Sequence, residues 1–161
     1  MRPDEPNADF HDVLRVLVEN DVRFIVVGAH ALAAHGIPRA TQDLDVWIDP
    51  TPENAARTWR ALVSFGTPLA DLGVQEADFV RPDVVVQLGI PPNRIDILTG
   101  VTGLRFEEAW TTRAEGTIEG VRVPVLGRQA LIQNKRAAGR HKDLGDIEAL
   151  EKNAARGDIK R

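Results

Sequence analysis

Three aspartates in two strand-like segments are the residues of this sequence best suited to chemistry. Asp43 and Asp45 are one residue apart in the apolar run DLDVWID, and Asp96 stands between two isoleucines in RIDIL. Side chains two positions apart on a strand point to the same face, so Asp43 and Asp45 should share one. If the two strands are neighbours, the three carboxylates converge, and they repel one another unless a cation lies among them.

A divalent metal is the cation that such a site predicts. Mg²⁺ takes oxygen ligands and completes its shell with waters and phosphates, and two such ions about 3.5–4 Å apart can clamp the attacking and leaving oxygens of a phosphoryl displacement. Asp43, Asp45 and Asp96 are therefore the predicted catalytic residues and ligands of Mg²⁺ (or Mn²⁺). The alternative, that exposed strand faces simply carry solvated aspartates, would be favoured for an isolated DxD pattern.

A glycine turn upstream strengthens the catalytic interpretation. In VVGAHAL, a short β-branched run meets Gly28 and then the start of a helix. The first N–H groups of a helix are unpaired and lie at the positive end of its dipole, which suits a phosphate, and glycine lets a backbone approach a ligand closely. Such a turn is common in α/β proteins, so its weight comes from its place shortly before the aspartate pair.

The elements that must position these residues predict one mixed α/β (α+β) domain. A mixed sheet flanked by helices is expected, with a short C-terminal helical tail, as a strand–helix body followed by helices indicates. The polar segment 1–8 is expected to be a flexible N-terminal arm and 9–161 a single domain. Helices are predicted at 9–20 with Asp9 as cap, 29–36, 51–66, 106–111, 128–138 and 144–155, strands at 23–27, 43–49, 84–90 and 93–98, and a hairpin turning at Glu119-Gly120.

Composition narrows the class of protein. The chain has 161 residues, 43% of them hydrophobic and 27% charged, which is typical of a soluble globular domain. A net charge of -4 argues against a general nucleic-acid-coating surface, and the absence of cysteine excludes disulfides and thiolate metal sites. No apolar run approaches the roughly 18 residues of a membrane helix, and the N-terminus lacks a signal-like apolar segment. A cytoplasmic protein without a membrane partner is expected.

Taken together, these motifs resemble the nucleotidyltransferase fold of the DNA polymerase β superfamily. Its signature is a glycine turn that opens a helix, an hDhD strand and a third carboxylate on a later strand; Gly28-Ala29, Asp43, Asp45 and Asp96 match in that order. More narrowly, GAHALAAHGIPRATQDLDV with LIQNKRAAGRHKDLGDIEAL is similar to the AbiEii-type branch, the nucleotidyltransferases of abortive-infection toxin–antitoxin systems and their small relatives.

The resemblance implies a set of nucleotide-binding residues. The backbone N–H groups of Gly28 and Ala29 would hold the triphosphate, with its charge offset by basic residues. At Ala29 the superfamily usually has Ser or Gly, so a hydroxyl contact is lost. The other implied nucleotide-binding residues are Arg39, Thr41, Lys135 and Lys142. For Lys135 and Lys142 the alternative is a helix end, where the dipole favours cations.

The function implied is a Mg²⁺-dependent nucleotidyltransferase. It would move a nucleoside monophosphate from an NTP substrate to a hydroxyl or phosphate acceptor (tRNA, protein or small molecule), including the role of a toxin with a cognate antitoxin. Two alternatives stay open: a non-catalytic nucleotide- or partner-binding subunit, which Ala29 would suit, and an antibiotic-modifying nucleotidyltransferase.

Three other side chains invite functional roles that have ordinary structural alternatives. His35, next to Gly36 at a helix end, is expected to be a dipole partner or solvent-exposed. His30 lies in the first helical turn, where a role at the phosphates and a structural role are equally open. Trp47 could stack on a base, although a core position is more common for such a residue.

Overall fold

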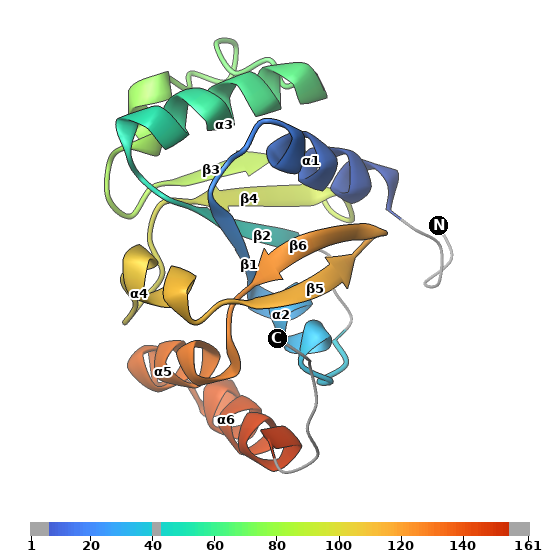
Figure 1. The fold of residues 1–161 in the computed structure, drawn as a ribbon, viewed down its shortest axis with the longest axis vertical. Helices are drawn as coiled ribbons and strands as arrows, with labels where there is room; N and C mark the ends of the chain where they lie inside the picture. The colour runs from blue at the N-terminus through green and yellow to red at the C-terminus, as the bar shows by residue number, and fades with distance from the viewer. Residues whose placement is uncertain (1–6, 40–42, 155–161) are drawn as a thin grey trace.

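The computed structural model describes residues 7–39 and 43–154, which form a six-stranded mixed sheet with helices on both sides (Figure 1). The strand order is β3-β4-β2-β1-β6-β5. Central β1 is antiparallel to β2 and parallel to β6, β2 is parallel to β4, and the outer strands β3 and β5 are antiparallel to β4 and β6. The strand bounds are β1 Phe24–Val27, β2 Asp43–Ile48, β3 Val85–Leu88, β4 Arg94–Leu98, β5 Ala114–Ile118 and β6 Val121–Val125. The predicted mixed α/β fold class is confirmed.

Two helical layers enclose the sheet. In Figure 1, α1 and α3 pack together on one side of the sheet, and the pair α5–α6 forms the opposite end of the molecule. The helix bounds are α1 Ala8–Glu19, α2 Gly28–Ala34, α3 Pro52–Phe65, α4 Phe106–Thr111, α5 Arg128–Ala138 and α6 His141–Ala154, with a 3₁₀ turn η1 at Glu76–Phe79. No helix within residues 7–39 and 43–154 is both long and apolar enough to cross a membrane.

The alternation in β2 gives its two faces different environments. Leu44, Val46 and Ile48 are fully buried and belong to the core. On the other face lie Asp43, Asp45 and then Trp47, whose exposed fraction is 1%. Trp47 contacts the ring of Phe106 on α4 edge to face, with centroids 5.2 Å apart. Trp47 is therefore a core aromatic, and the same face changes from apolar to acidic along the strand.

Most of the predicted helix signals act as expected. The Thr51 hydroxyl accepts from the Asn54 N–H at the start of α3, and Gly66 ends that helix in the left-handed region with φ 99°, as cap chemistry predicts. The β5–β6 hairpin turns through Glu119 and Gly120, both with positive φ, which is the conformation of a type I′ turn.

Three local predictions were wrong, each because a side chain found a different backbone partner. Asn7, rather than Asp9, caps α1 by accepting from the N–H groups of Asp9 and Phe10. Helix α6 begins at His141, before the predicted 144, because the Asp143 carboxylate accepts from the Arg140 N–H and closes an earlier first turn.

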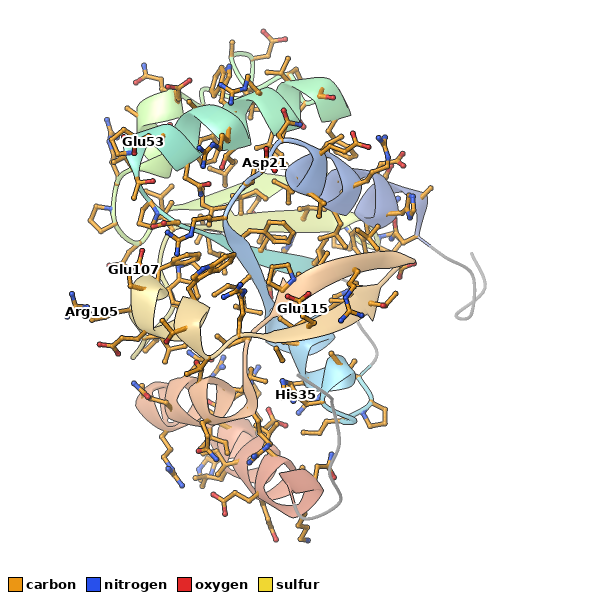
Figure 2. The ribbon with its side chains drawn as sticks, viewed as in Figure 1. Asp21, His35, Glu53, Arg105, Glu107 and Glu115 are labelled. Atoms are coloured by element: carbon orange, nitrogen blue, oxygen red, sulfur yellow. The ribbon has the colours of Figure 1, made fainter. Side chains whose placement is uncertain are left out.

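The third error concerns His35, at the end of α2 (Figure 2). The ring is buried, with an exposed fraction of 1%, and its Nε2 lies 2.8 Å from the Leu126 carbonyl oxygen. His35 therefore connects α2 to the segment after β6, and the expectation of solvent exposure was wrong.

Candidate active site

The register of β2 and β4 brings the three predicted aspartates together. The strands are parallel, with Asp43 opposite Arg94 and Asp45 opposite Asp96, and residues directly opposite one another on paired strands share a face. The carboxyls of Asp45 and Asp96 hydrogen-bond each other. The sequence motifs DLD and RID therefore build a single acidic site.

Burial and mutual repulsion favour the protonated form of the acidic site. Burial raises the pKa of Asp45 to about 7, and the neighbouring charges of Asp96 and Asp43 act in the same direction. Burial also raises the pKa of Asp96, although the Arg94 guanidinium opposes that shift. A hydrogen bond between two carboxyls requires one of them to be protonated, so the raised pKa of Asp45 agrees with its contact to Asp96.

Gly28 lies against this pair for a steric reason. Val27, the last residue of β1, is opposite Asp45 in the antiparallel register, and α2 begins at the next residue. Gly28 has φ 68°, and a Cβ there would collide with the Asp45 carboxylate. The turn needs glycine both for its conformation and for this close approach. Gly28 and Ala29 thus open a helix beside the carboxylates.

Arg94 completes the site, and sequence reasoning missed it. Its Nη2 donates to Asp43 Oδ2 over 2.6 Å, and its Nε lies 3.5 Å from Asp96 Oδ1. The available signal was its position two residues before Asp96, which places both on one face of β4. The pattern of acidic residues alone does not include Arg94 in the predicted site.

The donor set fits a hard divalent cation. Asp43 Oδ1 and Asp96 Oδ1 are buried and accept no hydrogen bond from the protein. Carboxylate oxygens left in this state are the ligands that Mg²⁺ prefers. In the part of the chain that the structure describes, no three acidic or histidine side chains already surround a single metal position. The carboxylates therefore share one face and have free oxygens, while Arg94 pairs with Asp43 and lies near Asp96.

Lys135, a predicted phosphate-binding residue, is engaged inside the α5–α6 pair. Its Nζ lies 3.1 Å from Asp146 Oδ2 and 3.4 Å from Asp143 Oδ1, and both carboxylates are buried. Arg39 also pairs with Asp146, and Arg140 pairs with Asp143. Burial lowers the pKa of Lys135, and the ion pair with Asp143 opposes the shift. No ion pair within residues 7–39 and 43–154 connects Lys135 to the three aspartates.

The topology still places α5 near the glycine turn. Strand β6 runs parallel to β1, and the Leu126 N–H donates to the Val26 carbonyl oxygen, so the chain leaves both strands at the same end of the sheet.

Of the other predicted nucleotide-binding residues, Lys142 is exposed on the first turn of α6. Thr41 lies outside the described residues.

His30 faces an apolar contact and a small hollow. The ring meets Phe10 edge to face at 5.6 Å, and it lines a hollow of about 240 Å³ with Thr117 and Glu119. Burial lowers its pKa, so the ring is neutral at pH 7. These contacts give His30 a structural role in joining α2 to α1.

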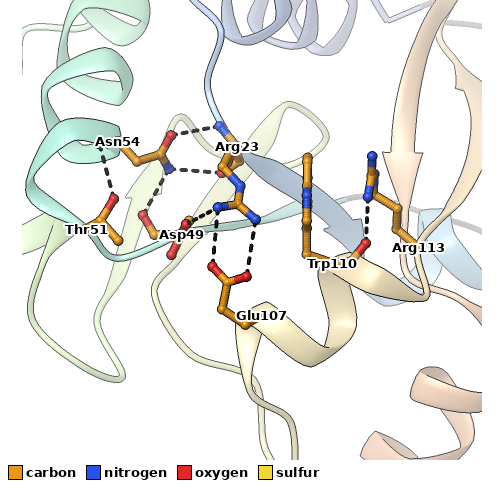
Figure 3. Close-up of polar contacts among 7 residues, drawn as sticks. All are labelled: Arg23, Asp49, Thr51, Asn54, Glu107, Trp110 and Arg113. Atoms are coloured by element: carbon orange, nitrogen blue, oxygen red, sulfur yellow. Dashed lines mark hydrogen bonds and ion pairs between the residues drawn. The ribbon is translucent and has the colours of Figure 1, made fainter.

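A second polar cluster fixes the other end of β1 (Figure 3). The Arg23 guanidinium pairs with Asp49 and Glu107, each at 3.3 Å, and lies 4.7 Å from the ring centroid of Trp110. Asn54 accepts from the Arg23 N–H and donates to the carbonyl oxygens of Arg23 and Asp49. We call these residues the Arg23 cluster; they fasten α3 and α4 to the start of β1, at the opposite end from Gly28.

Comparison with known proteins gives the site a family context. Residues 7–160 match the family described as "Nucleotidyl transferase of unknown function (DUF2204)". No curated protein matches the chain.

Solved structures share the fold at low sequence identity. A protein of Thermotoga maritima assigned as a nucleotidyltransferase is 17% identical, with 92% of each chain covered and a TM-score of 0.53. The lincosamide antibiotic adenylyltransferase LnuA with lincomycin bound is 15% identical, with 89% of this chain and 94% of that chain covered and a TM-score of 0.50. ANT(2'')-Ia in complex with adenylyl-2''-tobramycin is 16% identical, with 91% of each chain covered and a TM-score of 0.54. The nucleotidyltransferase resemblance is confirmed, and the narrower AbiEii-type resemblance stays a prediction.

Proposed function

Since the chain belongs to the DUF2204 family of nucleotidyl transferases, we propose that it moves a nucleoside monophosphate from an NTP to a hydroxyl or phosphate acceptor with Mg²⁺ or Mn²⁺. The observation that carries the proposal is the opposition of Asp45 and Asp96 across β2 and β4, with Asp43 on the same face and Gly28 against Asp45. Nucleotidyl transfer needs carboxylates converging beside a phosphate-binding turn, and this arrangement supplies both.

In this proposal Asp43, Asp45 and Asp96 would hold the metal, Asp43 and Asp96 through the Oδ1 atoms that lack protein partners. The bound ion would neutralise phosphate charge and acidify the acceptor hydroxyl. A bound cation would favour the ionised form of Asp45 and Asp96, because a cation lowers the pKa of nearby carboxyls. Asp96 would then help to activate the acceptor hydroxyl by accepting its proton.

The nucleotide lies at the glycine turn in the same proposal. The N–H groups of Gly28 and Ala29 face the β- and γ-phosphates, and Ala29 contributes only its main chain. Lys142 is exposed and available to a phosphate. Lys135 would have to leave two carboxylates to reach a phosphate. Its role in this proposal is therefore to fix α6 against α5. Arg39 joins the same cluster through Asp146.

For the acceptor, we propose a small molecule with a free hydroxyl as the first class to test. LnuA and ANT(2'')-Ia have nearly the same extent as this chain, with 94% and 91% of their lengths covered. LnuA is a lincosamide antibiotic adenylyltransferase seen with lincomycin bound, and ANT(2'')-Ia is seen in complex with adenylyl-2''-tobramycin. A tRNA or protein acceptor, and a toxin role with a cognate antitoxin, stay predictions from the AbiEii-type resemblance.

The test is transfer of labelled nucleotide. The purified chain is incubated with each α-³²P-labelled NTP, Mg²⁺ or Mn²⁺, and in turn tobramycin, lincomycin, total tRNA and cell protein; Asp45→Asn and an EDTA sample are the controls. Metal-dependent label on one acceptor class, absent from Asp45→Asn, is the expected result. Calorimetry provides an independent arm, because NTP should bind only with metal. Equal NTP affinity in EDTA would refute the metal-bridged site, and no binding under any condition would refute the proposed function.

A further inference from the structure

The acidic site already contains a positive charge of its own. Arg94 donates to Asp43 over 2.6 Å and lies 3.5 Å from Asp96. Asp43 is opposite Arg94 in the β2–β4 register, and Asp96 is two residues further along β4, so all three side chains lie on one face. The guanidinium therefore contacts both Asp43 and Asp96. On Asp43 it bonds Oδ2 and leaves Oδ1 unpartnered, and on Asp96 it lies near the unpartnered Oδ1.

The pairing of Arg94 is incomplete for a structural ion pair. A strong arginine–carboxylate pair is bidentate, with two parallel N–H···O bonds. Here one contact is short, the other is long, and the buried Nε has no hydrogen-bond partner. Buried Oδ1 atoms of Asp43 and Asp96 also have none. Buried polar atoms left unsatisfied destabilise a site.

The Arg23 cluster contains an arginine that is held both by ion pairs and by an aromatic ring. Arg23 makes ion pairs with Asp49 and Glu107, both at 3.3 Å, and packs on the ring of Trp110. The two arginine side chains are equally exposed, 33% for Arg94 and 34% for Arg23. They differ in that Arg94 has no aromatic contact in the described residues and its buried Nε has no hydrogen-bond partner.

From this contrast we infer that Arg94 is a positioning residue that occupies the cation position between Asp43 and Asp96 and is displaced from them when metal and nucleotide bind. The inference rests on the proposed function, since it concerns the same metal site. The guanidinium keeps its charge at any physiological pH, so a divalent ion must compete with it for the same two carboxylates. A triphosphate arriving with the metal offers the displaced guanidinium a new anionic partner. Metal and nucleotide should therefore bind together more readily than metal alone.

The experiment measures metal affinity directly, without catalysis. Mn²⁺ binding to the full chain is followed by electron paramagnetic resonance at about pH 7.5 for the parent, Arg94→Gln and Arg94→Lys. The matched control is Arg15→Gln, which also removes an arginine from an ion pair, with Glu19 on the exposed face of α1. Each titration is repeated with a non-reacting α,β-methylene analogue of the NTP that binds the parent.

Arg94→Gln should bind Mn²⁺ alone on the order of tenfold tighter than the parent, because a charge-assisted hydrogen bond no longer competes. The gain in Mn²⁺ affinity caused by the nucleotide analogue should shrink by a similar factor. Arg94→Lys, with a shorter side chain and a single donor group, should lie between the two. Arg15→Gln should match the parent.

Equal or weaker Mn²⁺ binding by a folded Arg94→Gln would overturn the inference and leave the metal site standing. If Arg94→Gln does not fold, Arg94→Lys decides the question, and an affinity no tighter than that of the parent would count against the inference. Failure of the parent to bind Mn²⁺ even with the analogue would refute the metal-dependent function first, and this inference with it.

Discussion

Replacing Asp45 by Asn should change the way stability depends on pH in the metal-free protein. Burial and the charges of Asp96 and Asp43 raise the pKa of Asp45 from 3.8 to about 7. Between these values the folded state binds a proton that the unfolded state releases. The contribution of Asp45 protonation to the free energy of unfolding is therefore fully present below about pH 4 and is lost as pH rises through 7. The variant has no such titration at this position, so its stability should fall much less over the same range.

The structure sets the size of this effect. One unit of pKa corresponds to about 1.4 kcal/mol, so a shift from 3.8 to about 7 gives about 4 kcal/mol. Solvent reaches part of the side chain, and screening reduces the expected loss to about 2–4 kcal/mol. Asn keeps the shape and removes the repulsion. Above pH 7.5, Asp45→Asn should be the more stable of the two proteins in EDTA.

The assay is urea unfolding in EDTA across about pH 4 to pH 8 for the parent, Asp45→Asn and, as a control, Asp71→Asn at an exposed aspartate. In a second arm Mg²⁺ and NTP are added. At a ligand concentration of a hundred times Kd, the parent should gain about 2.7 kcal/mol, or roughly 5–10 °C in melting temperature, and Asp45→Asn should gain little. An Asp45→Asn protein that is less stable than the parent at pH 8, yet responds fully to Mg²⁺ and NTP, would show that Asp45 is scaffold and refute the reasoning.

Three further substitutions test other parts of the structure. Gly28→Ala would place a Cβ against the Asp45 carboxylate at a positive φ. It should lower the free energy of unfolding by about 1–3 kcal/mol, and calorimetry should detect no NTP binding. Unchanged NTP affinity would contradict the close approach. Lys135→Met should destabilise the fold by about 3–5 kcal/mol in urea unfolding, because it leaves two buried carboxylates without their shared cation, and a near-neutral result would show that other cations suffice. Asn54→Ala removes a buried side chain that satisfies three backbone groups and should cost about 2–4 kcal/mol, whereas Asn20→Ala, which loses a single contact to a carbonyl, serves as its control.

The sequence predicts the acidic site well because each part of it is locally encoded. Asp43 and Asp45 alternate with apolar residues that go to the core, and Asp96 repeats the pattern between Ile95 and Ile97. This alternation determines which face each carboxylate takes. The alternation does not determine that the two strands are neighbours, with Asp45 opposite Asp96. That pairing depends on tertiary structure, so the sequence predicts the acidic site only if the strands pair.

Contacts between distant segments account for what could not be predicted. Lys135 has the appearance of a free cation in NKRAAGRHK, but the packing of α6 on α5 places two carboxylates against it. His35 looks like a helix-end residue until β6 delivers the Leu126 carbonyl oxygen to its ring. The position of Arg94 two residues before Asp96 predicts the face of its side chain, but only the β2–β4 register reveals its partner, Asp43.

The shortness of β1 has a mechanical consequence. The strand has four residues, so about 13 Å of extended chain separates the Arg23 cluster from the turn at Gly28. Hydrogen bonds to β2 and β6 border this strand on both sides, and no loop within it could absorb a displacement. A substitution that loosens the Arg23 cluster should therefore displace β1 and, with it, the turn at Gly28. If the Gly28 turn binds phosphate as proposed, the positional accuracy that it requires should limit tolerance to substitution around Asn54, even though none of these residues lies at the acidic site.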